Sequence, residues 1–561
     1  MKAVIIGGVT GGASAAARIR RLDENAEIVM FEKGQHVSFS NCSLPYYLSG
    51  EVPSSDKLIL MDPEKFWKRN HIEVRVNSEV LEINRGRKTV SVKNLETGEV
   101  YEEAYDKLVL SPGANPILPR SIKGTDLPHV FTVRNVSDIV RLKDYALGHE
   151  GKIAVVGGGF IGVETAENLS LAGKKVTLIE AAEQIMMPFD YDMVQILHKE
   201  AVDHGIRLIL GDGVSRIEPD RVVLSSGTEV QAATVVMAIG VAPDTGLAVK
   251  AGLKIGETRG IWVNHNYQTS DPDIYAVGDA IEVYNRLTCR PSRLALAGPA
   301  QRQARAAASH MYGELHNNCG VIGSCALKLF DMNAAATGLN EKTAKAAGIP
   351  YDFVYVQQSD KVSIMPDSAP LHLKLLFETP TGRLLGAQAI GKGSADKRID
   401  VIAAMITMGG TLEDLKELEL CYSPVFGTAK DAVNQAALAG LNILYGKIRQ
   451  IPVYDVRPLV EAGAYFIDVR EVDEYAKGHV TGAVNIPLSE FRERIGEIPT
   501  DRPVYLYCRT SHRSYQACLA LMQSGHPQVY NVSGSFQGLC LYEYYNDMVT
   551  GRQRIVTDYI F

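Results

Sequence analysis

Two cysteines near opposite ends of the 561-residue chain stand in surroundings suited to sulfur chemistry. Cys42 lies in residues 38–45, and Cys508 opens a polar loop over residues 508–514. Neither cysteine has the partner of a Cys-x-x-Cys motif, so each must act alone, through a mixed disulfide, a persulfide or an oxidised sulfur. The sequence therefore predicts chemistry on single sulfur atoms.

The Cys508 loop follows a predicted strand over residues 504–507 and precedes a predicted helix over residues 515–523. Backbone N–H groups of the loop and of the helix N-terminus would converge on the sulfur and lower its pKa. Four residues separate Cys508 from Arg513, one fewer than in the phosphate loop of tyrosine phosphatases. We expect an exposed loop that holds a small sulfur anion, with Cys508 and Arg513 as catalytic residues.

The elements that must position Cys42 begin with a glycine-rich turn. A predicted strand over residues 2–6 runs into Gly7 and Gly12, a helix follows over residues 13–22, and a second strand over residues 27–31 ends at Glu32. Position 9 is Val, so the G-x-G-x-x-G pattern is imperfect. Glu32 nevertheless stands where a carboxylate binds the ribose of a dinucleotide. The N-terminus is expected to form a buried strand and not a signal peptide.

A second unit carries the full pattern. Gly157, Gly159 and Gly162 follow a predicted strand over residues 152–156, and Glu180 ends the next strand. These glycines permit a tight turn, close approach of the pyrophosphate and close helix packing. Two such units predict two nucleotides, and Glu180 favours NADH because it would repel a 2'-phosphate.

Two further apolar strands run into glycine turns, over residues 108–116 and 274–280. With them, roughly residues 1–445 resemble the two-dinucleotide-binding flavoprotein reductases. The resemblance implies that the first unit binds FAD and the second NADH or NADPH. It assigns cofactor binding to Gly7, Gly12, Glu32, Lys33, Gly113, Asp279, Gly157, Gly159, Gly162 and Glu180, with Asp279 at the flavin ribityl chain.

Residues 452–545 resemble a single rhodanese domain, through Asp468, Arg470, Glu474 and the stretch 482–487. In that family the loop cysteine carries a persulfide, so Cys508 is the implied sulfur acceptor. Residues 38–47 resemble the redox motif of the coenzyme A disulfide reductases, and the fused rhodanese domain suggests the variant that acts on coenzyme A persulfide. A lowered pKa of Cys42 would make it a nucleophile at neutral pH.

The same resemblance implies a substrate channel and a homodimer. It places Ser14, Arg18, Arg21, Ser38, Asn41 and Lys430 around coenzyme A. A solvated polar helix face remains an alternative for the two arginines. Tyr422 would approach Cys42 of the partner subunit, whereas Met365 stands where the family has a second tyrosine. Related NADH oxidases and peroxidases carry a His in the first glycine turn, where this chain has Thr10, and this difference argues against peroxide reduction.

The fold class that follows is α/β, with two Rossmann-like domains, an α/β dimerisation domain and a C-terminal rhodanese domain. We expect an FAD-binding domain over 1–115 and 255–322, an NAD(P)H-binding domain over 116–254, a dimerisation domain over 323–446, a linker over 447–455 and the rhodanese domain over 456–561.

Composition limits the partners. The net charge is −7, and no basic block predicts binding to nucleic acid or to a membrane surface. Eight scattered cysteines fit the cytosol and have no metal-ligand spacing, so no metal is predicted.

The predicted function is NAD(P)H-dependent reduction of coenzyme A persulfide, polysulfide or disulfide through Cys42, coupled to sulfur transfer at Cys508 from a sulfane sulfur donor. One alternative is a disulfide reductase with an independent thiosulfate sulfurtransferase domain. Another is a redox-sensing sulfur carrier.

Overall fold

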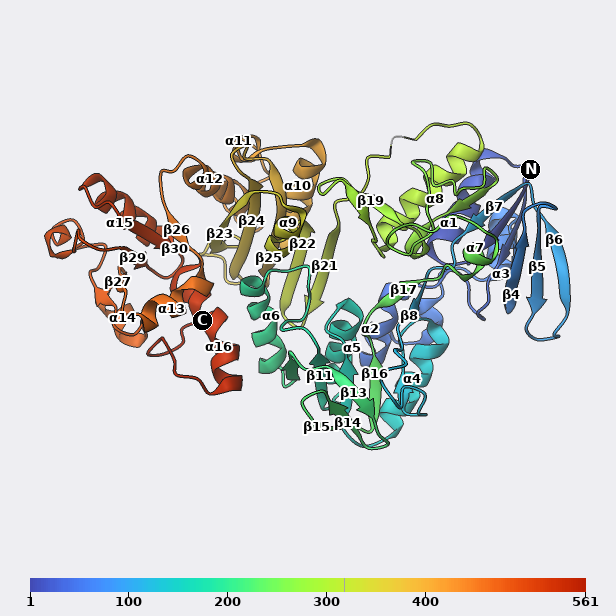
Figure 1. The fold of residues 1–561 in the computed structure, drawn as a ribbon, viewed down its shortest axis with the longest axis horizontal. Coiled ribbons are helices and arrows are strands. Elements are labelled where there is room, and N and C mark those ends of the chain that lie inside the picture. The colour runs from blue at the N-terminus through green and yellow to red at the C-terminus, as the bar shows by residue number, and fades with distance from the viewer. Residues whose placement is uncertain (317) are drawn as a thin grey trace. The chain divides into compact units, whose positions relative to one another are not determined.

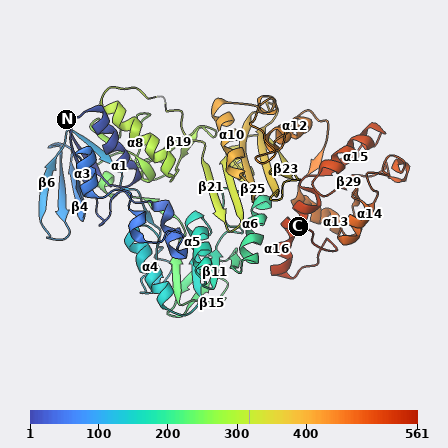
Figure 2. The same ribbon diagram turned by 180° about the vertical axis from the view of Figure 1, so that it is seen from behind.

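The computed structural model describes residues 1–316 and 318–561 (Figure 1, Figure 2). The chain divides into two compact units. The first unit holds residues 1–183 and 209–321, and the second holds residues 184–208 and 322–561. Within the described residues, no helix has the length and apolar character needed to span a bilayer.

The first unit contains two five-stranded sheets, ordered β18-β7-β1-β2-β3 and β12-β11-β10-β16-β9. The strands beside β1 and β10 run parallel to them, and both central strands are apolar runs with almost every residue buried. The ten strands are β1 (Lys2–Ile6), β2 (Glu27–Phe31), β3 (Glu73–Arg75), β7 (Lys107–Leu110), β9 (Val130–Phe131), β10 (Ile153–Val156), β11 (Val176–Glu180), β12 (Arg207–Leu210), β16 (Thr234–Met237) and β18 (Ile274–Ala276).

Helices and small sheets complete this unit. The helices are α1 (Thr10–Leu22), α2 (Leu44–Ser49), α3 (Pro63–Asn70), α4 (Val136–Gly148), α5 (Phe160–Leu171), α7 (Gly246–Lys250) and α8 (Ala297–Met311), with short 3-10 turns η1 (Asn41–Ser43), η2 (Ser55–Leu58) and η3 (Gly278–Ala280). The small sheets join β4 (Ser78–Asn84), β5 (Thr89–Asn94) and β6 (Val100–Ala104); β13 (Val214–Ile217), β14 (Arg221–Leu224) and β15 (Glu229–Gln231); β8 (Ala114–Pro116) and β17 (Val241–Pro243); and β19 (Val283–Asn285) and β20 (Arg290–Ser292).

The second unit contains an antiparallel and a parallel sheet. The antiparallel sheet has the order β21-β22-β25-β24-β23, and helices α10 and α12 pack against it (Figure 1). Its elements are β21 (Ser324–Leu329), β22 (Met332–Gly338), β23 (Tyr351–Ser359), β24 (Pro370–Glu378), β25 (Leu384–Gly391), α6 (Tyr191–Asp203), α9 (Glu341–Ala347), α10 (Ala395–Met408), α11 (Leu412–Lys416) and α12 (Ala432–Leu444).

The parallel sheet of the second unit has the order β26-β30-β29-β27-β28, and helices alternate with its strands along the sequence. Its elements are β26 (Gln450–Ile451), η4 (Val453–Asp455), α13 (Val456–Glu461), β27 (Tyr465–Asp468), α14 (Val472–Lys477), β28 (Val484–Asn485), η5 (Ile495–Glu497), β29 (Val504–Tyr507), α15 (His512–Gln523), β30 (Val529–Val532) and α16 (Ser535–Thr550). The predicted α/β fold class is confirmed, and the predicted strands over 2–6, 27–31 and 504–507 have the observed bounds.

Candidate functional site

The two glycine turns of the first unit are built alike. Gly7 and Gly157 have φ angles of 95° and 113°, in the region that favours glycine. A Cβ added at Gly12 would lie 1.8 Å from the Gly7 carbonyl oxygen, and one added at Gly162 would lie 1.8 Å from that of Gly157. Each turn therefore requires both of its glycines, although position 9 of the first turn is Val.

Glu32 and Glu180 close their turns in the same way. Glu32 accepts hydrogen bonds from the backbone N–H groups of Gly8 and Gly34, both at 2.9 Å. Glu180 accepts them from Gly158 at 2.6 Å and from Ala182 at 2.8 Å. Each carboxylate is thus fixed at the carboxyl end of a strand, beside a helix N-terminus, where a dinucleotide ribose binds in this kind of fold. The residues present fit two nucleotide cofactors.

The other predicted FAD contacts surround the first turn. Gly113 follows β7 with φ 73°, and Asp279 lies in η3 directly after β18. Because β18, β7 and β1 are consecutive parallel strands, these residues and Gly7 share one edge of the sheet. Burial raises the pKa of Asp279. Lys33 forms an exposed ion pair with Glu79 at 2.7 Å.

Cys42 is held beside this edge. The backbone N–H of Ser38 donates to the carbonyl of Gly8 at 2.8 Å, which ties the cysteine segment to the first glycine turn. Asn41 and Cys42 form η1, and Cys42 is exposed. Helix α2, which follows, packs on α5, the helix that begins at the second glycine turn.

The pKa of Cys42 is raised in this structure, so the prediction of a lowered pKa is wrong. Although part of the Cys42 side chain is exposed, partial desolvation by the surrounding protein raises the pKa of this thiol, and the carboxylates of Glu164 and Asp279 raise it further. Burial likewise raises the pKa of Glu164, to about 7, with added repulsion from Glu167. The hydroxyl of Tyr46 is hydrogen-bonded to Glu164. Sequence reasoning missed Glu164 because its effect on Cys42 depends on the packing of α2 against α5.

The predicted substrate side chains on α1 differ in their surroundings. Ser14 and Arg18 are half-buried and Arg21 is exposed. Arg18 donates to Ser309 through Nε at 3.2 Å and Nη2 at 3.0 Å, and pairs with Glu314 at 2.9 Å. Arg18 is therefore engaged within the protein, whereas Arg21 presents its charge to solvent.

Tyr422 and Lys430 lie on an exposed segment of the second unit, between α11 and α12. The base of this segment is fixed by Asp431, which pairs with buried Arg398 at 2.9 Å. Large apolar side chains stand out from it and from the adjoining residues 360–368: Ile364 is 81% exposed, Phe426 68% and Tyr422 52%. The two segments meet where the N–H of Val362 donates to the carbonyl of Pro424 at 3.4 Å.

Arg509 and His512 of the predicted loop are exposed, but Cys508 itself is buried, with 1% of its surface exposed. The helix after it begins at His512, three residues earlier than predicted, and it places Arg513 and Ser514 in its first turn. Ser514 Oγ lies 3.6 Å from the sulfur, and Ser535 Oγ lies 3.9 Å from it. Arg513 forms two hydrogen bonds with Glu474.

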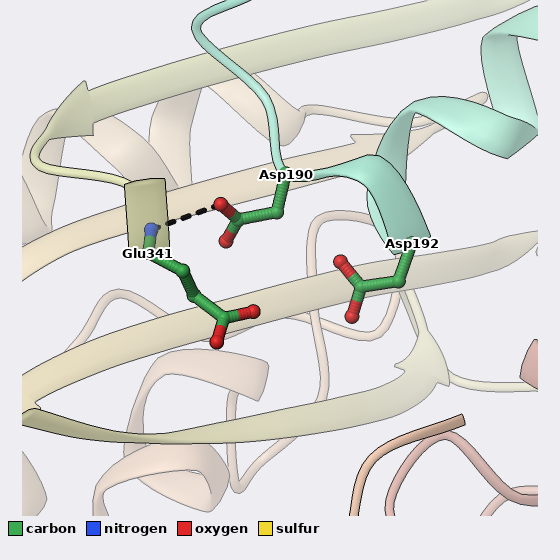
Figure 3. A group of neighbouring side chains, drawn as sticks. All are labelled: Asp190, Asp192 and Glu341. Atoms are coloured by element: carbon green, nitrogen blue, oxygen red, sulfur yellow. Dashed lines mark hydrogen bonds between the residues drawn. The ribbon is translucent and has the colours of Figure 1, made fainter. Parts of the chain in front are cut away.

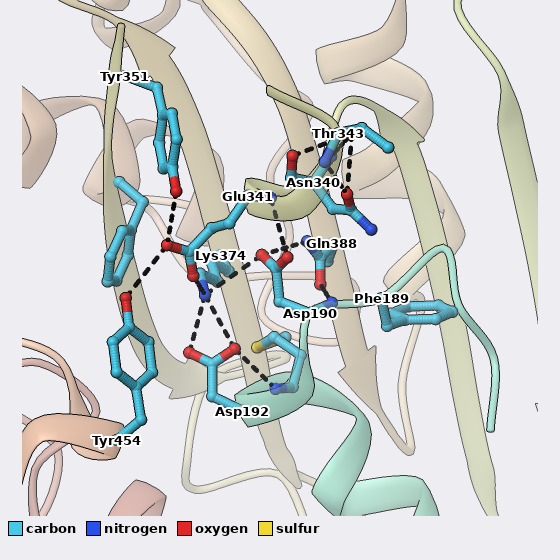
Figure 4. A network of polar contacts seen from close by, with 12 residues as sticks. Phe189, Asp190, Asp192, Asn340, Glu341, Thr343, Tyr351, Lys374, Gln388 and Tyr454 are labelled. Carbon is cyan, nitrogen blue, oxygen red and sulfur yellow. Dashed lines mark hydrogen bonds and ion pairs between the residues drawn. The ribbon is translucent and has the colours of Figure 1, made fainter. Parts of the chain in front are cut away.

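Three carboxylates gather elsewhere in the second unit. Asp190, Asp192 and Glu341 direct their side chains toward one another (Figure 3). The ammonium of Lys374 lies among them, 2.8 Å from both oxygens of Asp192, 2.5 Å from Glu341 and 3.2 Å from Asp190 (Figure 4). Burial alone would lower the pKa of Lys374, but the carboxylates outweigh it and raise that pKa well above its usual value. The group is therefore an ion-pair cluster.

Comparisons with known proteins agree with this architecture. Residues 1–304 match the model of the pyridine nucleotide-disulphide oxidoreductases, residues 325–433 match the dimerisation domain of that family, and residues 453–541 match a rhodanese-like domain. Coenzyme A disulfide reductase of Staphylococcus epidermidis is 35% identical over 436 residues, covering 77% of this chain and 98% of the relative.

Two solved structures extend over almost the whole chain. The crystal structure of reduced Bacillus anthracis CoADR-RHD has a TM-score of 0.93 and 43% identity, covering 97% of this chain and 98% of that one. The NAD-dependent persulfide reductase from A. fulgidus has a TM-score of 0.91 and 34% identity, covering 96% and 99%. The chain therefore belongs to the pyridine nucleotide-disulphide oxidoreductase family and carries a C-terminal rhodanese-like domain.

Proposed function

We propose that the protein uses NAD(P)H and FAD to reduce coenzyme A persulfide, polysulfide or disulfide through Cys42, and that Cys508 transfers sulfane sulfur. The observation that carries the proposal is the position of Cys42. Its segment is tied to the first glycine turn by the hydrogen bond from Ser38 to Gly8, and helix α2, which follows it, packs on α5. Because α5 begins at the second glycine turn, the segment that carries Cys42 is attached to elements of both predicted nucleotide sites.

The reaction divides between these residues. A bound FAD would supply the two electrons that NAD(P)H provides as a hydride. The Cys42 thiolate attacks the inner sulfur of the coenzyme A persulfide, forms a Cys42–coenzyme A disulfide and releases hydrosulfide. Two electrons and one proton then return Cys42 to its thiolate and release coenzyme A as a thiol. Asn41 precedes Cys42 in η1, Ser38 lies in the same segment, and Arg21 would supply an exposed cation for phosphate groups.

Residues Gly7, Gly12, Glu32, Gly113 and Asp279 would hold FAD, and Gly157, Gly159, Gly162 and Glu180 would hold NADH. The similarity to coenzyme A disulfide reductase and to persulfide reductase supports the substrate class. The matched dimerisation domain and the exposed apolar side chains around Tyr422 support a homodimer in which the partner subunit completes the site.

Cys42→Ser is the direct test. We expect the variant to lose NADH-dependent persulfide reduction and to retain bleaching of the flavin by NADH. Cys289→Ser, which changes an exposed cysteine of the same unit, is the matched control and should retain both activities. Equal turnover by Cys42→Ser and the native protein would remove Cys42 from the mechanism.

The two alternatives predict different kinetics. Steady-state rates with coenzyme A disulfide and with its persulfide separate plain disulfide reduction from persulfide reduction. A redox sensor would turn over below about 0.01 per second, far under the range of typical enzymes.

A further inference from the structure

The turn that begins α16 places a serine hydroxyl against the sulfur of Cys508. Ser535 is fully buried and is the first residue of the helix. Its Oγ accepts a hydrogen bond from the backbone N–H of Cys508 at 2.8 Å and donates toward Cys508 Sγ, 3.9 Å away. A hydroxyl has one donor and two acceptor sites, so it can make both contacts at once.

Ser535 holds this position against a backbone preference. Its φ angle is +52°, in the left-handed region that glycine enters freely and that residues with a side chain rarely adopt. Glycine would satisfy the turn with less strain. Strain of this kind, kept at a reacting atom, points to a role for the side chain.

Two residues of strand β23 also contact this turn. Gln357 donates to the carbonyl of Gly534 at 3.0 Å, and a Cβ added at Gly534 would lie 2.7 Å from the Tyr355 ring. The position before Ser535 therefore admits only glycine, and the antiparallel sheet fixes the turn. This support keeps the Ser535 hydroxyl aimed at the sulfur.

A second hydroxyl near the sulfur, that of Ser514, has a competing acceptor. Ser514 Oγ lies 3.6 Å from Cys508 Sγ, but it also lies 3.2 Å from the carbonyl of Ser511, which competes for its one proton. Among the described residues, Cys508 Sγ is the acceptor found for the proton of Ser535. The ionisable groups that face the sulfur are Arg513, which Glu474 pairs, and buried Cys518.

We propose that Ser535 is a positioning residue for sulfur transfer, whose hydroxyl donates a hydrogen bond to the thiolate form of Cys508. This inference rests on the proposed function of Cys508 as a sulfur acceptor. The thiolate attacks the outer sulfur of a persulfide or thiosulfate, forms a new S–S bond and expels a thiolate or sulfite. When a second nucleophile takes the outer sulfur, Cys508 leaves as the thiolate again. No electrons are gained or lost overall, and Ser535 stabilises the same anion in both steps.

Three variants of the full-length protein test the proposal. Ser535→Gly removes the hydroxyl and relieves the strain, Ser535→Ala removes only the hydroxyl, and Ser533→Ala removes a buried hydroxyl without a hydrogen-bond partner two residues earlier. The probe is methyl methanethiosulfonate, with mass spectrometry of the Cys508 peptide between pH 5 and 10. Both Ser535 variants should need a higher pH for half-maximal reaction, by about 0.5–1 unit, which is a three- to tenfold loss of thiolate at lower pH.

Ser533→Ala should titrate like the native protein. If Ser535→Gly keeps the native midpoint and changes only the melting temperature, the serine is structural and the proposal is wrong. A shift of equal size in Ser533→Ala would also overturn it, because the effect would then belong to the turn. Since the probe is not a substrate, a protein that fails to reduce coenzyme A persulfide can still show the shift, so failure of the two proposals can be told apart.

Discussion

The guanidinium of Arg513 binds the carboxylate of Glu474 through two hydrogen bonds, from Nη1 to Oε2 at 2.6 Å and from Nη2 to Oε1 at 2.8 Å. This two-point contact fixes the plane of the guanidinium at the first turn of α15. Glu474 was a marker of family resemblance in the sequence, and the structure gives it a contact.

We predict that Glu474→Gln lowers kcat/KM for thiosulfate by about tenfold, because one strong hydrogen bond is lost and Arg513 is no longer fixed beside the reacting sulfur. The measurement is thiocyanate formation from thiosulfate and cyanide. Asp473→Asn is the matched control, since Asp473 lies on the same helix and forms an exposed ion pair with Lys477 at 3.5 Å. A faster Glu474→Gln enzyme would mean that Glu474 restrains Arg513 from the substrate.

The pKa of Cys42 gives a prediction that depends on pH. Glu164, whose pKa is about 7, is mostly neutral at pH 6 and mostly charged at pH 8. Its charge disfavours the Cys42 thiolate only above pH 7. In Glu164→Gln, iodoacetamide should therefore alkylate Cys42 at the native rate at pH 6 and about two- to threefold faster at pH 8. This ratio corresponds to a fall in the pKa of Cys42 by a fraction of one unit.

Iodoacetamide labelling of the Cys42 peptide without NADH checks this expectation. Glu51→Gln is the control, because Glu51 is exposed and does not affect the pKa of Cys42. The same ratio at both pH values would contradict a role for the Glu164 charge.

Sequence reasoning found the features that depend on local pattern. The glycine turns, Glu32 and Glu180 were predicted because turn geometry and strand ends leave a regular spacing. Ser535 and Lys374 were missed, since their partners lie 27 and 182 residues away along the chain. The burial of Cys508 was also missed, because a polar loop is buried only where other elements, here the start of α16, cover it.

Glu180 should set the choice of nicotinamide nucleotide. Its carboxylate is fixed by Gly158 and Ala182, so it cannot turn away from a 2'-phosphate. We predict that Glu180→Ala improves kcat/KM for NADPH relative to NADH by at least about tenfold. Glu183→Ala, which removes a nearby exposed charge, should leave the ratio unchanged. An unaltered ratio in Glu180→Ala would assign the preference to other residues.

Tyr422 can be assigned to one subunit or the other by complementation. If it acts on Cys42 of the partner subunit, a heterodimer of Cys42→Ser and Tyr422→Phe chains contains one intact site and should regain about half of the native activity. If both residues act within one chain, the heterodimer has no intact site. Differently tagged chains purified together, with each homodimer as its control, separate the two results.

The last prediction concerns the buried cluster around Lys374. Lys374→Met leaves Asp190, Asp192 and Glu341 without their cation, and an uncompensated buried charge costs roughly 3–5 kcal/mol. The melting temperature of the second unit should fall far more than in Lys392→Met, which breaks an exposed pair worth about 0–1 kcal/mol. Adding Asp192→Asn to Lys374→Met should recover part of the loss in melting temperature, because it removes one of the buried carboxylate charges that no longer has a cation. If the double variant is no more stable than Lys374→Met, the loss comes from the packing of the lysine stem beside Phe353 and not from the charges.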